Sequence, residues 1–240
     1  MSGLDVTDLS VDVNAEGGRA RSTVTGGFNG GTLDLAPVLQ VEDGELVVLM
    51  PEKRKILSGV KLEGGAFTQL LSRAVPIFRN ALDPRGGLDV TVDSARIPLG
   101  AQMLQKMTAA SDVQMRNTSM GSSGTLQGLM RMADLQDRRL NLSDQDISVR
   151  ISDGKVQHDE LDVEAGDYTL QVSGTVGLDK SLDMKVELPI TRELAGSDAL
   201  FAVLRGRRLT AKIEGTLDNP KLQRDILREN LKKLAPSSPL

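Results

Sequence analysis

The sequence predicts a mainly β protein with a few short helices, arranged as an elongated antiparallel meander. Apolar and polar residues alternate through many short runs, and turn-forming residues separate these runs. Side chains along a strand point alternately to the two faces of a sheet, so each run would have one apolar and one polar side. Short connections favour antiparallel neighbours, and the resulting sheet would have one apolar and one solvated face.

The N-terminal part is expected to form four strands. Asn29 and Gly30 are a strong hairpin signal between the second and third of them. Pro37 lacks the amide hydrogen that a sheet needs, so the third strand is expected to lie at an edge of the sheet or to carry a bulge. The expected strands cover residues 4–13, 20–28, 32–41 and 45–50.

The middle of the chain is expected to mix helices with strands. Pro76 would kink the longest helix, and Asp83 with Pro84 would end it. The next helix is expected to turn Met103, Leu104 and Met107 inward. The expected elements are helices over 66–82, 101–110, 126–133 and 193–204, and strands over 88–97 and 112–120.

The clearest alternation lies between residues 147 and 220. Turn-forming triplets such as Ser152-Asp153-Gly154 separate the runs. Asn219-Pro220 is expected to begin a C-terminal helix over 222–234, which would dock on the end of the sheet and shield the last strand. The expected strands cover residues 147–151, 161–163, 168–178, 182–190 and 209–217.

Four segments of this region carry a recognisable strand pattern. They are ISDGKV at 151–156, YTLQVSGTVGLD at 168–179, LDMKV at 182–186 and IEGTLDNPKL at 213–222. These segments resemble the C-terminal part of AsmA-like proteins, relatives of the TamB-type repeating β-groove proteins of the bacterial envelope. The resemblance covers about a third of the chain.

The resemblance implies a module that binds or conducts lipid along an apolar β-groove, in outer-membrane assembly or lipid transport. The implied partners are lipid or phospholipid acyl chains, with other envelope proteins as further candidates. It also implies a periplasmic protein that is tethered to the inner membrane by a segment absent from this chain. Residues 1–5 lack the basic and apolar regions of a signal peptide, and no run is long enough to span a membrane. Because AsmA-like proteins usually carry an N-terminal membrane anchor, the resemblance implies that the chain is a fragment of a longer protein, or else that it is not exported.

The chain is expected to divide into three parts. An N-terminal β region with inserted helices would cover 1–135, and an AsmA-like meander with a closing helix would cover 136–235. The last residues, 236–240, are rich in proline and serine and are expected to be a disordered tail.

The composition excludes several classes of function. The net charge is −4, and the chain has four Phe, one Tyr and no Trp. A nucleic-acid surface would need basic residues and stacking aromatics, so no nucleic-acid partner is expected. The chain has no cysteine, which excludes disulfides, thiolate metal sites and a cysteine nucleophile.

The sequence contains no catalytic constellation, so neither an enzyme nor a cofactor is expected. His158 is the one histidine, and its acidic neighbours Asp159, Glu160 and Asp162 match no zinc or EF-hand spacing. It is expected to lie on a polar strand edge. The segment 121–124 resembles a nucleophile elbow, but its spacing is one residue short.

Two hypotheses account for the apolar side of the meander. In the first, the sheet forms an open trough whose apolar side holds acyl chains. In the second, the same side is a closed core of a structural or interaction module without a ligand, covered by the helices at 66–82 and 222–234. The residues expected to line a lipid groove are Val149, Ile151, Leu170, Val172, Val176, Met184, Val186, Leu188 and Ile213.

Overall fold

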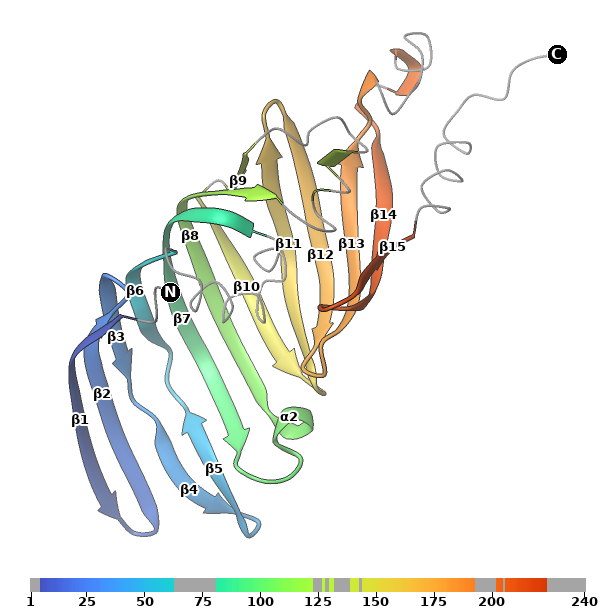
Figure 1. Ribbon diagram of the computed structural model, residues 1–240. Coiled ribbons are helices and arrows are strands. Elements are labelled where there is room, and N and C mark those ends of the chain that lie inside the picture. The colour runs from blue at the N-terminus through green and yellow to red at the C-terminus, as the bar shows by residue number, and fades with distance from the viewer. Residues whose placement is uncertain are drawn as a thin grey trace.

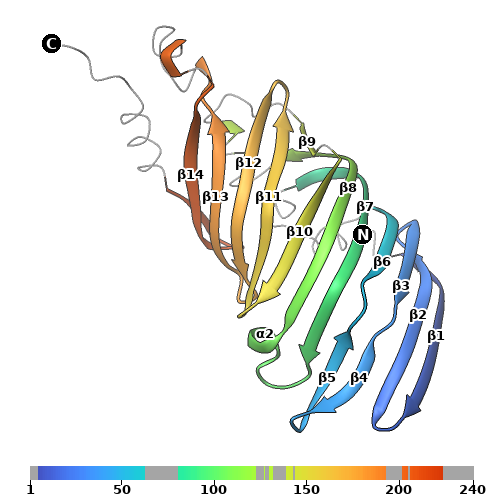
Figure 2. The same ribbon diagram turned by 180° about the vertical axis from the view of Figure 1, so that it is seen from behind.

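The computed structural model shows one long antiparallel sheet, which confirms the predicted fold class. Figures 1 and 2 show the sheet from its two sides, curved and twisted from β1 at one end to β15 at the other. The structure describes residues 5–62, 81–122, 127, 130–131, 139–142, 144–192, 202–204 and 206–223.

The strands of the described residues range from 3 residues in β9 and β15 to 18 in β7, and the helix α2 (Met103–Lys106) lies between β7 and β8. The strands are β1 (Val6–Glu16), β2 (Arg19–Phe28), β3 (Gly31–Leu35), β4 (Val38–Glu42), β5 (Glu45–Met50), β6 (Arg54–Lys61), β7 (Ala81–Pro98), β8 (Thr108–Ser122), β9 (Leu140–Leu142), β10 (Gln145–Ser152), β11 (Lys155–Ala165), β12 (Tyr168–Gly177), β13 (Ser181–Pro189), β14 (Arg208–Thr216) and β15 (Pro220–Leu222).

The sheet is a meander in which neighbours in the chain are neighbours in space. β3 and β4 both pair with β2, and β5 and β6 both pair with β7, so each of these couples is one strand with an interruption. β9 and β10 likewise both lie between β8 and β11. The sheet continues through the predicted division at residue 135, because β10 pairs with β8.

Pro37 interrupts its strand as expected, but not at an edge of the sheet. It separates β3 from β4, which lie between β2 and the β5–β6 strand. The sheet tolerates proline here because only its donor is missing, and the Pro37 carbonyl still accepts from the Ser22 amide at 3.0 Å.

The end predicted for the long central helix is wrong. Residues 63–80 lie outside the described residues, but Ala81 and Leu82 belong to β7 and pair with Ser122 and Gly121 of β8. Asp83, expected to stop a helix, has a φ of 45° at a register shift within β7. Here, pairing with a distant strand overrides the local helical spacing.

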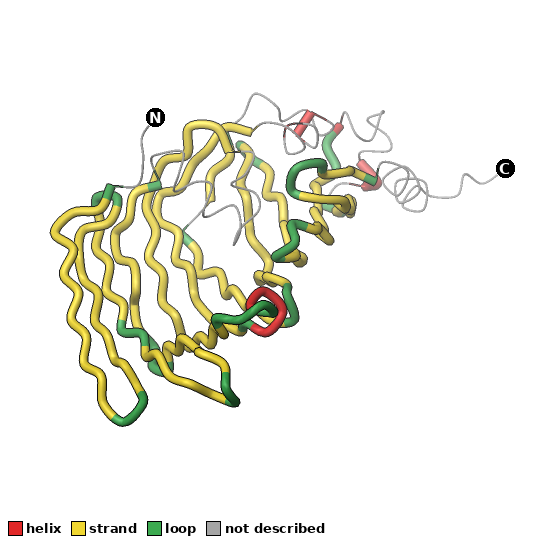
Figure 3. Tube along the Cα trace, turned by 60° about the horizontal axis from the view of Figure 1, so that its bottom comes forward, coloured by secondary structure: helices red, strands yellow, loops and turns green. Residues whose placement is uncertain are grey.

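The helix predicted over 101–110 is a single turn, α2, and β8 begins at Thr108. Met103 and Leu104 were expected to face inward, but they are 36% and 47% exposed. The reason is the position of α2 at the end of the β7–β8 connection, beyond the strands rather than on a face of the sheet (Figure 3).

The C-terminal helix does not begin at Pro220. Residues 220–222 form β15, which pairs with Ile213, Glu214 and Gly215 of β14. The Gln223 amide extends this pairing by donating to the Lys212 carbonyl at 2.9 Å. Residues 224–240 lie outside the described residues, and with them the rest of the predicted helix and the tail.

Candidate binding surface on the apolar face of the sheet

One face of the sheet is apolar from β1 to β14. Directly opposed residues on neighbouring strands share a face, as do residues two positions apart on one strand. Traced in this way, the apolar face carries Val11, Val24, Leu35, Leu33, Leu57, Val90, Val113, Ile147, Val149, His158, Gly174, Met184 and Ile213. We call this surface the apolar face and its reverse the polar face.

A β-bulge in β11 keeps this face continuous. Asp159 and Glu160 together stand opposite the single residue Ser173 of β12, because the register shifts between His158 and Leu161. An extra residue moves the alternation by one position. His158 before the bulge and Leu161 after it therefore lie on the same face, although they are three positions apart.

The polar face carries ion pairs that cross the strands. Asp89 of β7 is bonded by Lys55 of β6 at 3.1 Å and by Arg116 of β8 at 2.6 Å. Farther along the sheet, Lys212 of β14 lies 3.4 Å from Asp183 of β13. The polar face thus carries paired charges at the solvent boundary. An apolar ligand would therefore bind on the apolar face.

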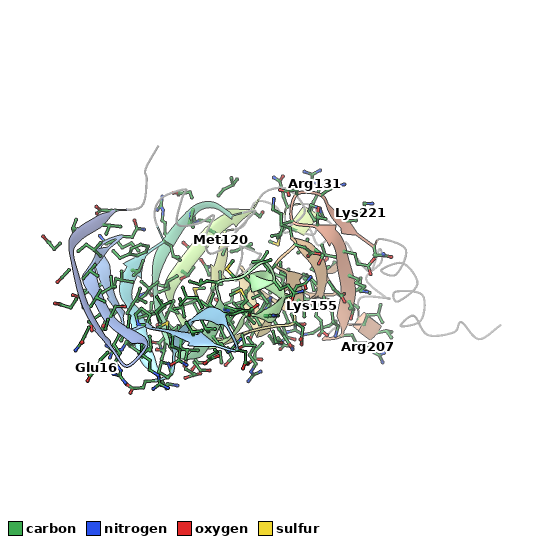
Figure 4. All side chains as sticks on the ribbon, turned by 90° about the horizontal axis from the view of Figure 1, so that it is seen from below. Glu16, Met120, Arg131, Lys155, Arg207 and Lys221 are labelled. Atoms are coloured by element: carbon green, nitrogen blue, oxygen red, sulfur yellow. The ribbon has the colours of Figure 1, made fainter. Side chains whose placement is uncertain are left out.

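The C-terminal half of the apolar face is buried. All nine predicted lining residues lie on it, but Ile151 and Ile213 are only partly buried, whereas the other seven belong to the core. The same core contains Leu62, Met130 and Leu204, which lie outside the strands and are at most 1% exposed. Figure 4 shows Met120, another core residue, from β8. The nine residues are therefore brought together, and their role as a lipid lining stays a prediction.

The N-terminal end of the same face is open. On β1, Val6, Leu9, Val11 and Val13 are 46%, 55%, 56% and 65% exposed. On β4 and β5, the directly opposed Val41 and Leu46 are 64% and 41% exposed. We call these six residues the open section. None was predicted as lining, although the alternation of Leu9, Val11 and Val13 was visible in the sequence, because alternation alone does not tell which part of a face is covered.

A shallow depression lies within this part of the face. Its volume is about 330 Å³, and its lining includes Ala15, Ala20, Leu39 and Leu46 from β1, β2, β4 and β5. Ala15 stands opposite Ala20, and Ala20 stands opposite Leu39, so the three residues follow one row across the strands. Small and apolar side chains thus leave room beside the open section.

A second cleft, of about 440 Å³, lies at the interruptions in β3–β4 and β5–β6. Arg19 and Arg21 of β2 line one wall, and Arg54 lines another. Arg54 is held by both carboxylate oxygens of Asp34 at 2.9 Å. Glu52 also lines the cleft. The carboxylates of Glu52 and Asp34 offset the positive charge of the arginines, so the cleft carries both signs of charge.

His158 lies on the apolar face, not on a polar edge as predicted. It is 3% exposed and stands opposite Val149 and Gly174. Its Nδ1 is 2.7 Å from the Asp159 carbonyl oxygen, so Nδ1 carries the proton that it donates, and Nε2 has no hydrogen-bond partner among the described residues. His158 lies two positions after the buried Val156, so alternation along β11 turns its ring to the apolar face, and the described part of the chain holds no group of side chains suited to a metal ion.

Burial lowers the pKa of His158 below its ordinary value of 6.5, and the Asp159 carbonyl and carboxylate only partly oppose this. At acidic pH the unfolded chain therefore binds this proton before the folded chain does. Folding stability should fall as the pH drops below about 6.5, with a slope of at most about 1.4 kcal/mol per pH unit. Melting temperatures at several pH values from neutral to mildly acidic would measure this loss. His158→Leu should lose less stability over this range, and an unchanged pH dependence would contradict the assignment.

Fold and surface together define the class of this protein as an elongated antiparallel β-meander with one apolar face, open at its N-terminal end. Comparison with protein-family models, curated proteins and solved structures found no match to this chain. Among the described residues, no helix has the length and apolar character to cross a membrane.

Proposed function

We propose that this protein is a non-enzymatic module that binds lipid acyl chains on its apolar face. The observation that supports this is the open section, where six large apolar side chains of one face are 41–65% exposed. Leu9, Val11 and Val13 follow one another along one side of β1, and large exposed apolar patches mark sites of interaction. The resemblance of four C-terminal segments to AsmA-like proteins supports lipid transport or outer-membrane assembly in the periplasm as the setting.

The mechanism would be passive. An acyl chain laid along the open section would remove apolar surface from water, which stabilises the complex by about 25 cal/mol per Å² of buried area. The depression beside Leu39 and Leu46 offers space for part of a chain. A polar head group would remain at the rim, and no covalent step is needed.

A structural module with a closed core is the second candidate. It is favoured by the burial of the C-terminal half, where Val186 and Leu188 are 2% and 0% exposed. In this reading the apolar face only stabilises the sheet. The two candidates differ in what the open section does, so the test is directed there.

Val41→Lys and Leu46→Lys should each weaken binding of a fluorescent phospholipid analogue by about tenfold or more. Burying one such side chain contributes about 1.5–3 kcal/mol, and tenfold in Kd corresponds to about 1.4 kcal/mol. Fluorescence titration would give the Kd, and native mass spectrometry would detect co-purified lipid.

Thr25→Lys is the matched control, because Thr25 is exposed on the polar face of β2, opposite Asp34. It adds the same charge and should leave lipid binding unchanged. A parent protein that binds no lipid, or an equal loss in the Thr25→Lys variant, would favour the structural module.

A further inference from the structure

β1 forms one edge of the sheet along its full length. It pairs with β2, and no other strand of the described residues pairs with it. All 11 residues of β1 are exposed. Figure 1 places this strand at one extremity of the molecule, and Figure 4 shows Glu16 at the outer margin. The opposite end of the sheet is the short β15, so β1 is the longer free edge.

β1 carries only part of the usual protection of an edge strand. Natural edges are kept from pairing by charged side chains, above all lysine, by proline, by short length or by bulges. β1 has no lysine, arginine or proline, and its one irregularity is the register shift near Asp8, whose φ is 49°. The segment from Ser10 to Glu16 pairs with β2 without a break in register. The backbone of that segment is therefore available to a further strand.

The apolar side chains of β1 also lack a neighbouring strand on one flank. Val11 and Val13 are 56% and 65% exposed, with β2 on one flank only. Val186, on the same face, has β12 and β14 on its two flanks and is 2% exposed. A strand added to β1 would cover the second flank of its valines with side chains of its own apolar side.

The polar side of β1 indicates which charge an added strand should carry. Asp12 and Glu16 stand opposite Thr23 and Arg19 of β2, and β1 contains no basic residue. A second copy of β1 would bring acidic residues together across the new pair, which is unfavourable. A strand with lysine or arginine on its polar side would repeat the arrangement in which Glu16 faces Arg19.

We propose that β1 is the docking edge for a strand of a separate partner protein. The partner strand is extended, with apolar residues on one side alternating with basic residues on the other, and it continues the sheet by main-chain hydrogen bonds. This inference goes beyond lipid binding, because pairing at the edge uses the backbone of β1 and leaves the exposed apolar side chains of β4 and β5 open.

The test uses the full chain and synthetic strand peptides. One labelled peptide alternates valine with threonine and lysine, a second replaces each lysine by glutamate, and a third is the lysine peptide with alternate backbone amides N-methylated. Fluorescence anisotropy should show that the lysine peptide binds at least tenfold more tightly than the other two. Its affinity should fall as salt rises, because exposed charge pairs are screened.

The double variant Asp12→Lys with Glu16→Lys should reverse the preference to the glutamate peptide, while its melting temperature stays close to that of the parent. Both residues are exposed, so the fold does not depend on their charge. Equal binding of the N-methylated peptide would overturn strand pairing, and an unchanged preference in the double variant would overturn the charge assignment. Analytical ultracentrifugation would show whether the parent protein is a dimer. A dimer that Val11→Lys converts to a monomer would assign the edge to a second copy of this chain instead. Asp12→Lys alone should leave lipid binding at Val41 and Leu46 unchanged, because Asp12 lies on the polar face, opposite Thr23. Val11 belongs to the open section, so Val11→Lys serves only to test for a dimer.

Discussion

Val186→Lys should unfold the protein or lower its melting temperature by roughly 8–16 °C, which corresponds to about 4 kcal/mol for a chain of this size. Val186 is 2% exposed on β13, directly between Val172 of β12 and Ala211 of β14. A lysine there would lose its hydration, and the described residues around Val186 on the same face include no carboxylate to pair with it; a buried unpaired charge costs several kcal/mol. Thermal unfolding followed by circular dichroism would measure the change.

Val41→Lys is the matched control, because Val41 is on the same face but 64% exposed. Its lysine can extend into water along its methylene stem, so stability should stay within about 0.5 kcal/mol of the parent. A Val186→Lys variant as stable as Val41→Lys would mean that water reaches the C-terminal half of the apolar face. That result would support the lipid lining predicted around Val172 and Val186.

Asp89→Ala should destabilise the protein by about 1–3 kcal/mol, because it removes a buried acceptor, while the half-exposed Lys55 and Arg116 side chains can still be solvated. Asp89 is 4% exposed, and one carboxylate oxygen accepts from the Gly59 amide at 2.7 Å while the other accepts from Lys55 and Arg116. The alanine would leave the Gly59 amide without this partner at an irregular part of β6. Chemical denaturation would give the free energy of unfolding.

The pKa of Asp89 gives this prediction a pH dependence. Burial alone would raise the pKa, but the Gly59 amide and the Lys55 and Arg116 side chains outweigh it and hold the pKa below 3.8. The stability that Asp89 contributes is therefore complete above about pH 4 and is lost as the pH falls through its folded pKa.

Asp93→Ala is the control for Asp89→Ala, since the Asp93 side chain is 38% exposed and pairs with Lys53 at 2.7 Å. Exposed pairs contribute about 0–1 kcal/mol, so this variant should lose little stability. Equal losses for the two alanine variants would contradict a special role for the buried carboxylate.

Most strands were predictable from the sequence because a period of two reports directly on a sheet with one apolar face, but β6 and β9 were not among the expected strands. Leu170 and Val172, for example, were assigned to the correct strand and the correct face. The errors occurred where a local signal competed with pairing to a distant segment. Leu82 continues a helical stripe, and Pro220 is typical of a helix start, yet both lie in strands that pair across the sheet.

The candidate surface was predictable only in part. Alternation places Val13 and Val186 on one face, but their exposed fractions of 65% and 2% depend on what packs against each end of that face. His158 and Leu161 share a face only because the bulge at Asp159 and Glu160 displaces the alternation by one residue. Neither the cover of a face nor the place of a bulge has a simple local signature in the residue pattern.

The sequential pairing of the strands has a consequence for how proteins of this kind could change in length. A hairpin is a self-contained unit here, because each strand bonds to the strands before and after it in the chain. Duplicating or deleting one hairpin would leave the direction of every remaining strand unchanged and keep the apolar side chains on one side. Adding a single strand would instead reverse the direction of all strands that follow. Evolution of such a sheet would thus favour steps of two strands, and the overall reach of the molecule could be adjusted without redesigning its interior.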